Sequence, residues 1–299
     1  MASASEPAAP AATDATATAA ATAAAAPAKA FRVYEDSGPV HDHYCQMRSN
    51  HSLATTRRMV AFWRDGFGKR AGGRMTVREA LRKIDSFVDR SDPDASFPNS
   101  LHCLQAAEGA RKEGKPAWYQ LVALLHDVGK LMYVWGSCEE GQGGRATDPQ
   151  WALGGDTWIV GVRIPDCAVY PQLSARNADA AHPVLGAAPL GQYAPGVGIM
   201  NCEFAFGHDE YAYLWALHNK VPLPPEGLAM LRLHSCYPWH TGGAYRELMA
   251  PGDEALEAAV RDFNRFDLYT KADALPDFEA AWPHYQAIIN ELCPGELDW

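Results

Sequence analysis

One ten-residue segment, residues 121–130 with the sequence LVALLHDVGK, restricts the possible folds of this chain more than any other. Its large apolar residues recur at the first, fourth, fifth and eighth positions, which predicts a helix with one buried face. His126 and Asp127 are adjacent and can lean toward one point, and Lys130 lies one turn after His126 on the same face. Buried groups of this kind are costly unless they are paired or bind a metal. The segment therefore predicts a helical core containing either a satisfied His–Asp hydrogen bond or a metal site.

The composition excludes several classes of protein. Of the 299 residues, 47% are hydrophobic and 21% are charged, which is typical of a globular protein with a sizeable core. The formal charge of −10 argues against nucleic acid or an anionic membrane surface as a partner. The sequence contains no run of eighteen apolar residues, so it predicts no transmembrane helix. The seven scattered cysteines include no CxxC pair, so we expect a reducing compartment and a cytoplasmic protein.

The chain divides into a tail and one domain. Residues 1–30 are mostly Ala, Thr, Ser and Pro, which predicts a disordered tail because such a segment cannot bury enough apolar surface. The tail has neither the arginines of a mitochondrial presequence nor the leucine-rich core of a secretory signal. Residues 31–299 show no internal repeat and no second core, so we predict a single, mostly helical domain.

Helices dominate the predicted secondary structure. They are expected at residues 52–63, 76–88, 117–134, 207–217, 224–234, 253–269 and 278–292, and along a segment that contains His102. Thr76 and Glu79 fit a capping box, and Asn99 or Ser100 is expected to cap the helix of His102. Residues 31–50 read as an extended arm. A small hairpin is predicted at 158–164 and 168–170, and a surface insertion or lid at 136–148.

Six potential metal ligands lie in apolar helical surroundings. They are His102, His126, Asp127, His208, His234 and Asp267. Taken singly, each buried histidine is more often a core residue than a ligand. Together, imidazoles and carboxylates suit iron or manganese, and zinc is possible. Six ligands are more than one tetrahedral site needs and a carboxylate can bridge, so the set predicts a dinuclear centre. Spacing alone does not group these residues.

Longer motifs supply the grouping. The order His…His-Asp…Asp is the signature of the HD-domain superfamily, and the surrounding residues resemble the myo-inositol oxygenase family more closely. The matching motifs are residues 92–94, 97–102, 105–109, 124–130, 207–211, 234–242, 263–271 and 293–299. They occur in the order of the family and cover about residues 31–299. The resemblance implies an HD-domain-like helical bundle.

The resemblance also implies an activity and a cofactor. Members of that family use dioxygen as co-substrate to cleave the ring of myo-inositol between C1 and C6, which gives D-glucuronate. They carry two Fe ions in a mixed-valent centre. By resemblance, His102, His126, Asp127 and Asp267 would hold one iron. His208 and His234 would hold the other, with Asp127 as a bridge.

The substrate site is implied in the same way. Lys130 matches a lysine that contacts the reacting hydroxyl, where an ammonium would favour an alkoxide. The other expected substrate contacts are Arg32, Asp89, Gly155, Asp156, Ser235 and Lys271. Glycine at 154 and 155 would let the backbone approach the ligand closely. The expected partner is a small polyol, with no nucleic acid and no membrane, and we expect a monomer. The stretch between Lys130 and Gln150 is longer than the resemblance leads us to expect.

Two alternatives stay open at this point. A metal-dependent HD-type phosphohydrolase would use the same His and His-Asp ligands, with additional Arg or Lys for a phosphate. A regulatory helical module would hold the same residues as structural hydrogen bonds and would carry no stoichiometric iron.

Overall fold

The computed structural model describes residues 34–69, 72–91, 98–136, 148–269 and 276–299, with Met1, Gly141 and Gly143. Most of the tail at 1–30 and of the insertion at 136–148 falls outside these residues, as do the predicted substrate contacts Arg32 and Lys271. The division into a tail and one domain therefore stays a prediction.

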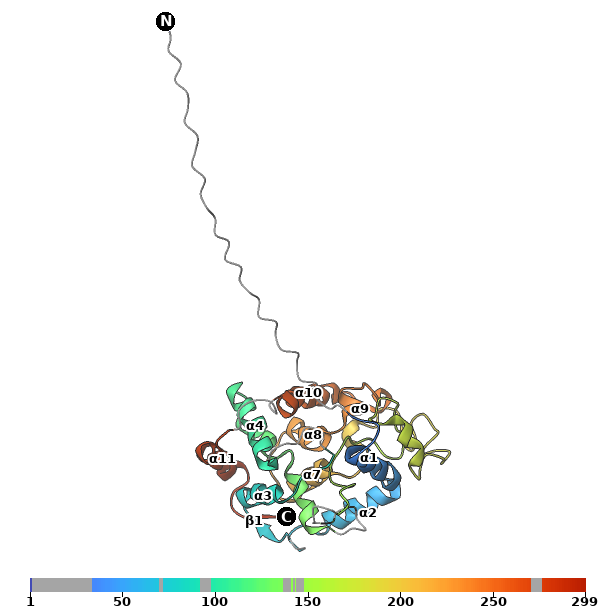
Figure 1. Ribbon diagram of the computed structural model, residues 1–299, viewed down its shortest axis with the longest axis horizontal. Coiled ribbons are helices and arrows are strands. Elements are labelled where there is room, and N and C mark those ends of the chain that lie inside the picture. The colour runs from blue at the N-terminus through green and yellow to red at the C-terminus, as the bar shows by residue number, and fades with distance from the viewer. Residues whose placement is uncertain are drawn as a thin grey trace. The chain divides into compact units, whose positions relative to one another are not determined.

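The described part of the chain is mostly helical, which confirms the predicted fold class (Figure 1). The α-helices are α1 (Pro39–Asn50), α2 (Leu53–Arg64), α3 (Val77–Lys83), α4 (Asn99–Lys112), α5 (Ala117–Leu125), α6 (Met132–Trp135), α7 (His208–His218), α8 (Pro225–Leu233), α9 (Tyr237–His240), α10 (Asp253–Tyr269) and α11 (Phe278–Leu292). Short 3-10 helices are η1 (Ile84–Ser86), η2 (Val128–Leu131), η4 (Pro171–Arg176), η5 (Ile199–Asn201) and η6 (Arg246–Leu248). Among the described residues, no helix is both long and apolar enough to cross a membrane.

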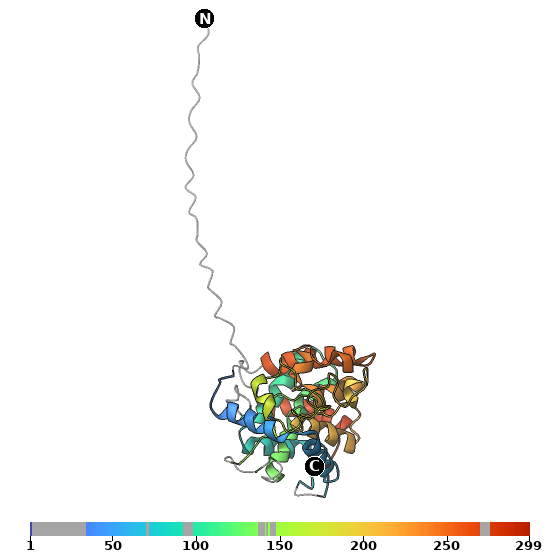
Figure 2. The same ribbon diagram turned by 90° about the vertical axis from the view of Figure 1, so that its right-hand side faces the viewer.

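The functional part of the bundle is built from its central helices. α4, α5, α8 and α10 pack on one another, and α7 packs on α8, α2 and η2. Figure 1 shows α7 and α8 in the middle of the ribbon. In the turned view of Figure 2, the blue α1 lies on the left and the orange-red α10 at the top. Side chains that point inward from α4, α7, α8 and α10 can therefore meet.

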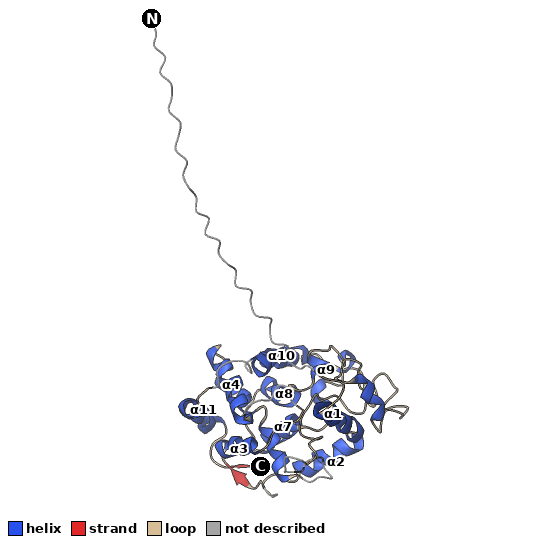
Figure 3. Cartoon of the chain, viewed as in Figure 1, coloured by secondary structure: helices blue, strands red, loops and turns tan. Residues whose placement is uncertain are grey.

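The two strands do not lie where the sequence predicted them. They are β1 (Arg74–Met75) and β2 (Leu297–Asp298), an antiparallel pair that joins distant parts of the chain (Figure 3). The predicted hairpin at 158–170 is wrong, because these residues form turns with one isolated bridge, from Ile159 to Phe204. Gly161, with a φ of 77°, breaks the apolar run, which is buried in the core instead.

The predicted arm at residues 31–50 is also wrong over most of its length, since Pro39–Asn50 forms α1. Proline suits the first turn of a helix because it has no amide hydrogen to leave unpaired. The buried residues of α1 are His43, Tyr44, Met47 and Arg48. Three of these four side chains are polar or aromatic, so the sequence shows no clear apolar stripe.

The helix predicted at 117–134 breaks at the His-Asp pair. α5 ends at Leu125, and Asp127 has φ −94° and ψ 0° before η2 begins. The capping box of Thr76 and Glu79 is confirmed. The predicted cap of α4 is wrong, because Asn99 lies inside the helix and binds the carbonyls of Ile84 and Phe87.

Trp299 anchors the end of β2 in the core. Its ring stacks on Trp215 with centroids 4.6 Å apart, and its Nε1 donates to the Met75 carbonyl. Trp299→Ala should lower the free energy of unfolding by about 3–5 kcal/mol, because it removes a large buried ring. Urea unfolding measures the loss. Leu217→Ala, at a side chain that is 47% exposed, serves as a control and should change little. Equal stability of the two variants would contradict the prediction.

His51 makes the fold sensitive to acid. Its buried ring meets Trp151 and Trp158 edge to face, and burial lowers the pKa of His51 to about 3. The unfolded chain binds this proton below a pH of about 6.5, whereas the folded protein resists it until the pH nears 3. The contribution of His51 to the free energy of unfolding is therefore fully present at neutral pH. It is lost as the pH falls from about 6.5 to about 3.

Between pH 7 and pH 4, the wild type should lose about 3 kcal/mol more stability than His51→Phe. Urea unfolding at the two pH values tests this. His182→Phe, at an exposed histidine, should behave like the wild type. Parallel pH profiles for the wild type and His51→Phe would refute the role of His51.

Candidate metal centre

Five segments bring the six candidate ligands together. His102 lies within α4, His126 and Asp127 directly follow α5, and His208 is the first residue of α7. His234 directly follows α8, and Asp267 lies near the end of α10. All six side chains are buried, with at most 7% of any residue exposed. They form two groups of three whose ligand atoms lie within 4.8 Å of one another.

The first group contains His102, His126 and Asp267. His102 Nε2 lies 2.8 Å from Asp267 Oδ1 and 3.3 Å from His126 Nε2. His126 Nε2 lies 3.6 Å from the same carboxylate oxygen. Two imidazole nitrogens and one carboxylate oxygen therefore face a common point.

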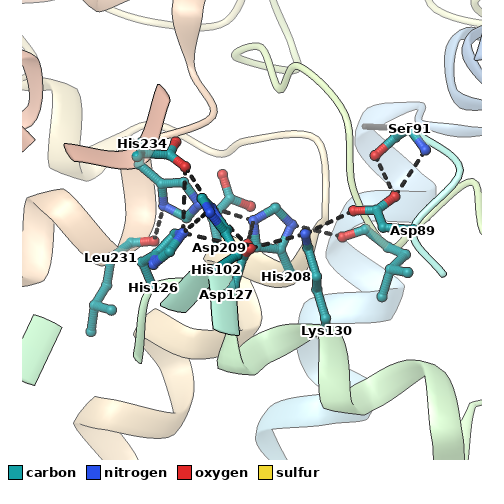
Figure 4. A network of polar contacts seen from close by, with 12 residues as sticks. Asp89, Ser91, His102, His126, Asp127, Lys130, His208, Asp209, Leu231 and His234 are labelled. Atoms are coloured by element: carbon teal, nitrogen blue, oxygen red, sulfur yellow. Dashed lines mark hydrogen bonds and ion pairs between the residues drawn. The ribbon is translucent and has the colours of Figure 1, made fainter. Parts of the chain in front are cut away.

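The second group contains Asp127, His208 and His234. His208 Nε2 lies 3.1 Å from Asp127 Oδ1 and 2.9 Å from His234 Nε2. Figure 4 shows these three side chains in one network of polar contacts. This group again offers two imidazoles and one carboxylate.

Asp127 lies between the two groups. Its Oδ1 faces His208, whereas its Oδ2 lies 3.5 Å from His126 Nε2 and 3.8 Å from His102 Nε2. One carboxylate thus turns one oxygen to each group, which is the arrangement of a bridging ligand.

The histidine tautomers favour a bound cation. His126 Nδ1 lies 2.9 Å from the Ala123 carbonyl, and His208 Nδ1 lies 2.9 Å from the Leu153 carbonyl. His234 Nδ1 likewise lies 3.1 Å from a carbonyl, that of Leu231. A carbonyl only accepts, so each Nδ1 carries a proton, which leaves Nε2 as the ring nitrogen available to a metal. His208 Nε2 and His234 Nε2 lie 2.9 Å apart. Two such nitrogens beside the Asp127 carboxylate form a donor set that fits metals.

Electrostatics keep the two candidate carboxylates ionised. Burial alone would raise the pKa of Asp127, but Lys130 and His126 hold it well below its usual value. His102 and His126 likewise hold the pKa of Asp267 well below its usual value, against the effect of burial. Burial and the neighbouring His208 lower the pKa of His234 to about 3. Asp127 raises the pKa of His126 and that of His208 against the effect of burial, so a metal that binds these two imidazoles would displace a proton.

Gly129 explains why the His-Asp turn can lie against α7. A Cβ at this position would lie 1.8 Å from the His208 carbonyl oxygen, which is backbone and cannot swing away. Only glycine permits this approach. The contact fixes the turn of Asp127 relative to the first residue of α7.

Gly129→Ala should therefore separate Asp127 from His208 and lower the stability by about 3 kcal/mol through overpacking. Metal content and thermal unfolding measure the two effects. Gly227→Ala on α8 is the matched control, because its Cβ would meet nothing closer than 3.2 Å. A Gly129→Ala protein with the metal content and melting temperature of the wild type would show that the contact is unimportant.

Lys130 lies at the edge of the centre. Its Nζ is 3.0 Å from Asp127 Oδ2 and 3.0 Å from Asp89 Oδ2 (Figure 4). The expectation that it shares a helical face with His126 is wrong, because the chain here is a 3-10 turn in which positions three apart align. Ser91 donates to Asp89 Oδ1 from both its amide and its hydroxyl. Lys130 therefore joins the candidate ligand Asp127 to a second buried carboxylate.

A cavity with an empty volume of about 490 Å³, its mouth included, is lined by five of the six candidate ligands, all except His126. It is lined by all of the described residues that were predicted to contact substrate, which are Asp89, Lys130, Gly155, Asp156 and Ser235. The sequence reasoning missed five further lining residues, Tyr34, Tyr44, Ser91, Tyr237 and Leu268. Tyr44 and Tyr34 both donate to Asp156 Oδ1. No spacing in the sequence marks these tyrosines, since they lie more than 110 residues from Asp156.

Comparison with known proteins gives a consistent result. A family model described as myo-inositol oxygenase matches residues 38–299. Inositol oxygenase of Mus musculus is 42% identical over 275 residues, which cover 90% of this chain and 91% of the relative. That of Homo sapiens shows the same identity and coverage. Inositol oxygenase of Dictyostelium discoideum is 36% identical over 229 residues, or 76% of this chain and 75% of the relative.

Proposed function

This chain belongs to the myo-inositol oxygenase family, and we propose that it uses dioxygen to cleave the ring of myo-inositol between C1 and C6, which gives D-glucuronate. The observation that carries the proposal is the shared carboxylate of Asp127, which faces two groups of ligands beside a cavity of hydroxyl-binding side chains. Activation of dioxygen needs a redox-active centre, and binding of a polyol needs a cavity with hydrogen-bonding side chains.

The cofactor of this proposal is a mixed-valent pair of Fe ions. One iron would be held by His102, His126, Asp127 and Asp267, and the other by His208, His234 and the same Asp127. Imidazole and carboxylate donors suit iron in two oxidation states, and the second site has only three protein ligands. When bound, the two irons would supply redox-active ions with open coordination positions for dioxygen and substrate, while the polyol itself would be the net electron donor.

The side chains of the cavity account for recognition of a neutral polyol. Asp89 and Asp156 accept hydrogen bonds from hydroxyl groups, and Lys130 and Ser235 donate to them. Gly155 has a φ of 100°, and a Cβ there would lie 2.7 Å from Met47 Sδ. Glycine at this position therefore lets the loop before Asp156 pack against α1. Arg32 and Lys271 are proposed as further substrate contacts.

Lys130 is the proposed catalytic residue. Two carboxylates within 3.0 Å of its Nζ stabilise the ammonium form. A charged ammonium cannot act as a base, so Lys130 would instead donate to a substrate hydroxyl oxygen and stabilise the alkoxide that forms there. This donor would lie next to the proposed metal ligands, because Lys130 Nζ is 3.0 Å from Asp127 Oδ2.

The phosphohydrolase alternative fits the cavity less well. Among the described residues that line it, Lys130 is the only Lys or Arg, and its charge is already balanced by Asp89 and Asp127. A phosphate group would meet two carboxylates there with little positive charge left for it.

The test is to measure iron content and then oxygen consumption coupled to glucuronate formation, with myo-inositol as substrate. We expect two irons per chain and one glucuronate per dioxygen. An iron-loaded, reduced sample that takes up no oxygen with myo-inositol would overturn the proposal. Phosphatase activity in the same sample would favour the alternative.

We further propose that the protein works as a monomer in the cytoplasm. The six described cysteines are all free thiols, which suits a reducing compartment. Light scattering at several protein concentrations tests the monomer.

A further inference from the structure

Arg48 on α1 is an unusual buried cation. Its side chain is fully buried, and its Nη2 donates to the Val169 carbonyl at 2.8 Å. Its Nε and Nη1 have no hydrogen-bond partner within the described ranges, and no carboxylate there forms an ion pair with it. Burying a charge in this way is costly, so a purely structural role would favour an apolar residue at this position.

Two aromatic rings hold the guanidinium instead of an ion pair. Arg48 Cζ lies 4.0 Å from the centre of the Trp158 ring and 5.9 Å from that of Tyr44. Aromatic faces attract cations, and the attraction grows when water is absent. The charge is thus kept in place without being neutralised.

Tyr44 connects Arg48 to the cavity. It lies one turn before Arg48 on α1, and its hydroxyl accepts from the Asp156 amide at 2.8 Å and donates to Asp156 Oδ1 at 3.3 Å. Asp156 is 3% exposed and lines the cavity. Arg48, Tyr44 and Asp156 therefore form a row from the core to the substrate site.

The two ends of this row carry opposite charges. Burial lowers the pKa of Arg48, and the nearby Tyr44 and Asp156 act in the opposite direction. The positive field of Arg48 therefore acts on Asp156, which Tyr44 holds by two hydrogen bonds. A carboxylate held in this way can accept hydrogen bonds from two neighbouring hydroxyls of a polyol.

We propose that Arg48 is a positioning residue for substrate binding, whose buried charge, together with the Tyr44 hydroxyl, holds Asp156 as an oriented carboxylate in the cavity. This inference rests on the proposed function, because it assigns the polyol as the ligand of Asp156. If Arg48 instead only fills the core, its loss should reduce stability and leave substrate affinity unchanged.

The experiment compares binding of myo-inositol to the iron-loaded full chain without oxygen, measured by equilibrium dialysis, with kcat, KM and iron content measured in parallel. Arg48→Met removes the charge and keeps an apolar chain of similar length. We expect an affinity at least about tenfold weaker and a higher KM, with unchanged iron content. Arg48→Lys keeps a charge and should recover affinity to within about threefold of the wild type.

Two further variants make the test specific. In an Asp156→Asn background, Arg48→Met should cause no additional loss of affinity, because its effect passes through the carboxylate. Arg57→Met removes an exposed arginine of α2 that binds Glu203 and does not line the cavity, so affinity should stay unchanged. If Arg48→Met does not fold, Tyr44→Phe replaces it, since this variant keeps the ring and removes the hydroxyl link to Asp156.

The outcomes separate the two proposals. Wild-type affinity in Arg48→Met, or in Tyr44→Phe where that replaces it, overturns the role of Arg48. The role of Arg48 is also overturned if the Arg48→Met/Asp156→Asn double variant binds myo-inositol more weakly than Asp156→Asn alone. A wild-type protein that neither binds nor oxidises myo-inositol overturns the proposed function, and the inference about Arg48 falls with it.

Discussion

Asp127→Asn should release iron from both groups of ligands. The side chain keeps its size but loses the charge that faces His208 on one side and His126 on the other. Loss of a ligand shared by both metals should weaken metal binding by more than about 100-fold. Metal analysis after dialysis should then find well under one iron per chain, and oxygen uptake with myo-inositol should be undetectable.

Asp262→Asn is the matched control for this experiment. Asp262 lies on α10, and its carboxylate binds Lys115 and Tyr119 and does not line the cavity. It should retain the iron content of the wild type. An Asp127→Asn protein that keeps two irons would show that this carboxylate is not the bridge.

Lys130→Met should keep both irons and lose most turnover. The substitution retains the apolar part of the side chain and removes only the ammonium, which binds Asp127 without belonging to either group of ligands. Removing a donor that stabilises a developing negative charge should lower kcat by about 100- to 1000-fold. Single-turnover glucuronate formation by an iron-loaded sample measures the change.

The loss of Lys130 also leaves Asp89 without its cation. Lys130 holds the pKa of Asp89 below its usual value against the effect of burial, so this carboxylate should become easier to protonate in Lys130→Met. Lys115→Met serves as the control, because Lys115 pairs with Asp262 outside the cavity. Turnover by Lys130→Met within a few-fold of the wild type would refute the catalytic role.

Long helices with clear end signals were predictable from the sequence. α10 and α11 begin and end at the predicted residues, because each has a regular apolar stripe and acidic residues in its first turn. The prediction of secondary structure failed where contacts between distant residues determine the structure. α1 looked irregular because its buried face carries Tyr44 and Arg48, whose partners are more than 100 residues away.

The site was predictable in part. The adjacent His126 and Asp127 stood out, but nothing in the spacing joins His102 to Asp267, which is 165 residues away. Family resemblance supplied that grouping. Directly after the break of the helix at Asp127, Gly129 approaches the His208 carbonyl, a tertiary contact that no local rule reveals. The roles of the six residues as metal ligands stay predictions until iron is measured.

The convergence of His208 and His234 has a consequence for stability. The fold holds the two imidazoles 2.9 Å apart beside the Asp127 carboxylate. A cation that binds this group and not the unfolded chain would add its binding free energy to the native state by mass action. Thermal unfolding should therefore occur at a higher temperature with added metal than with a chelator.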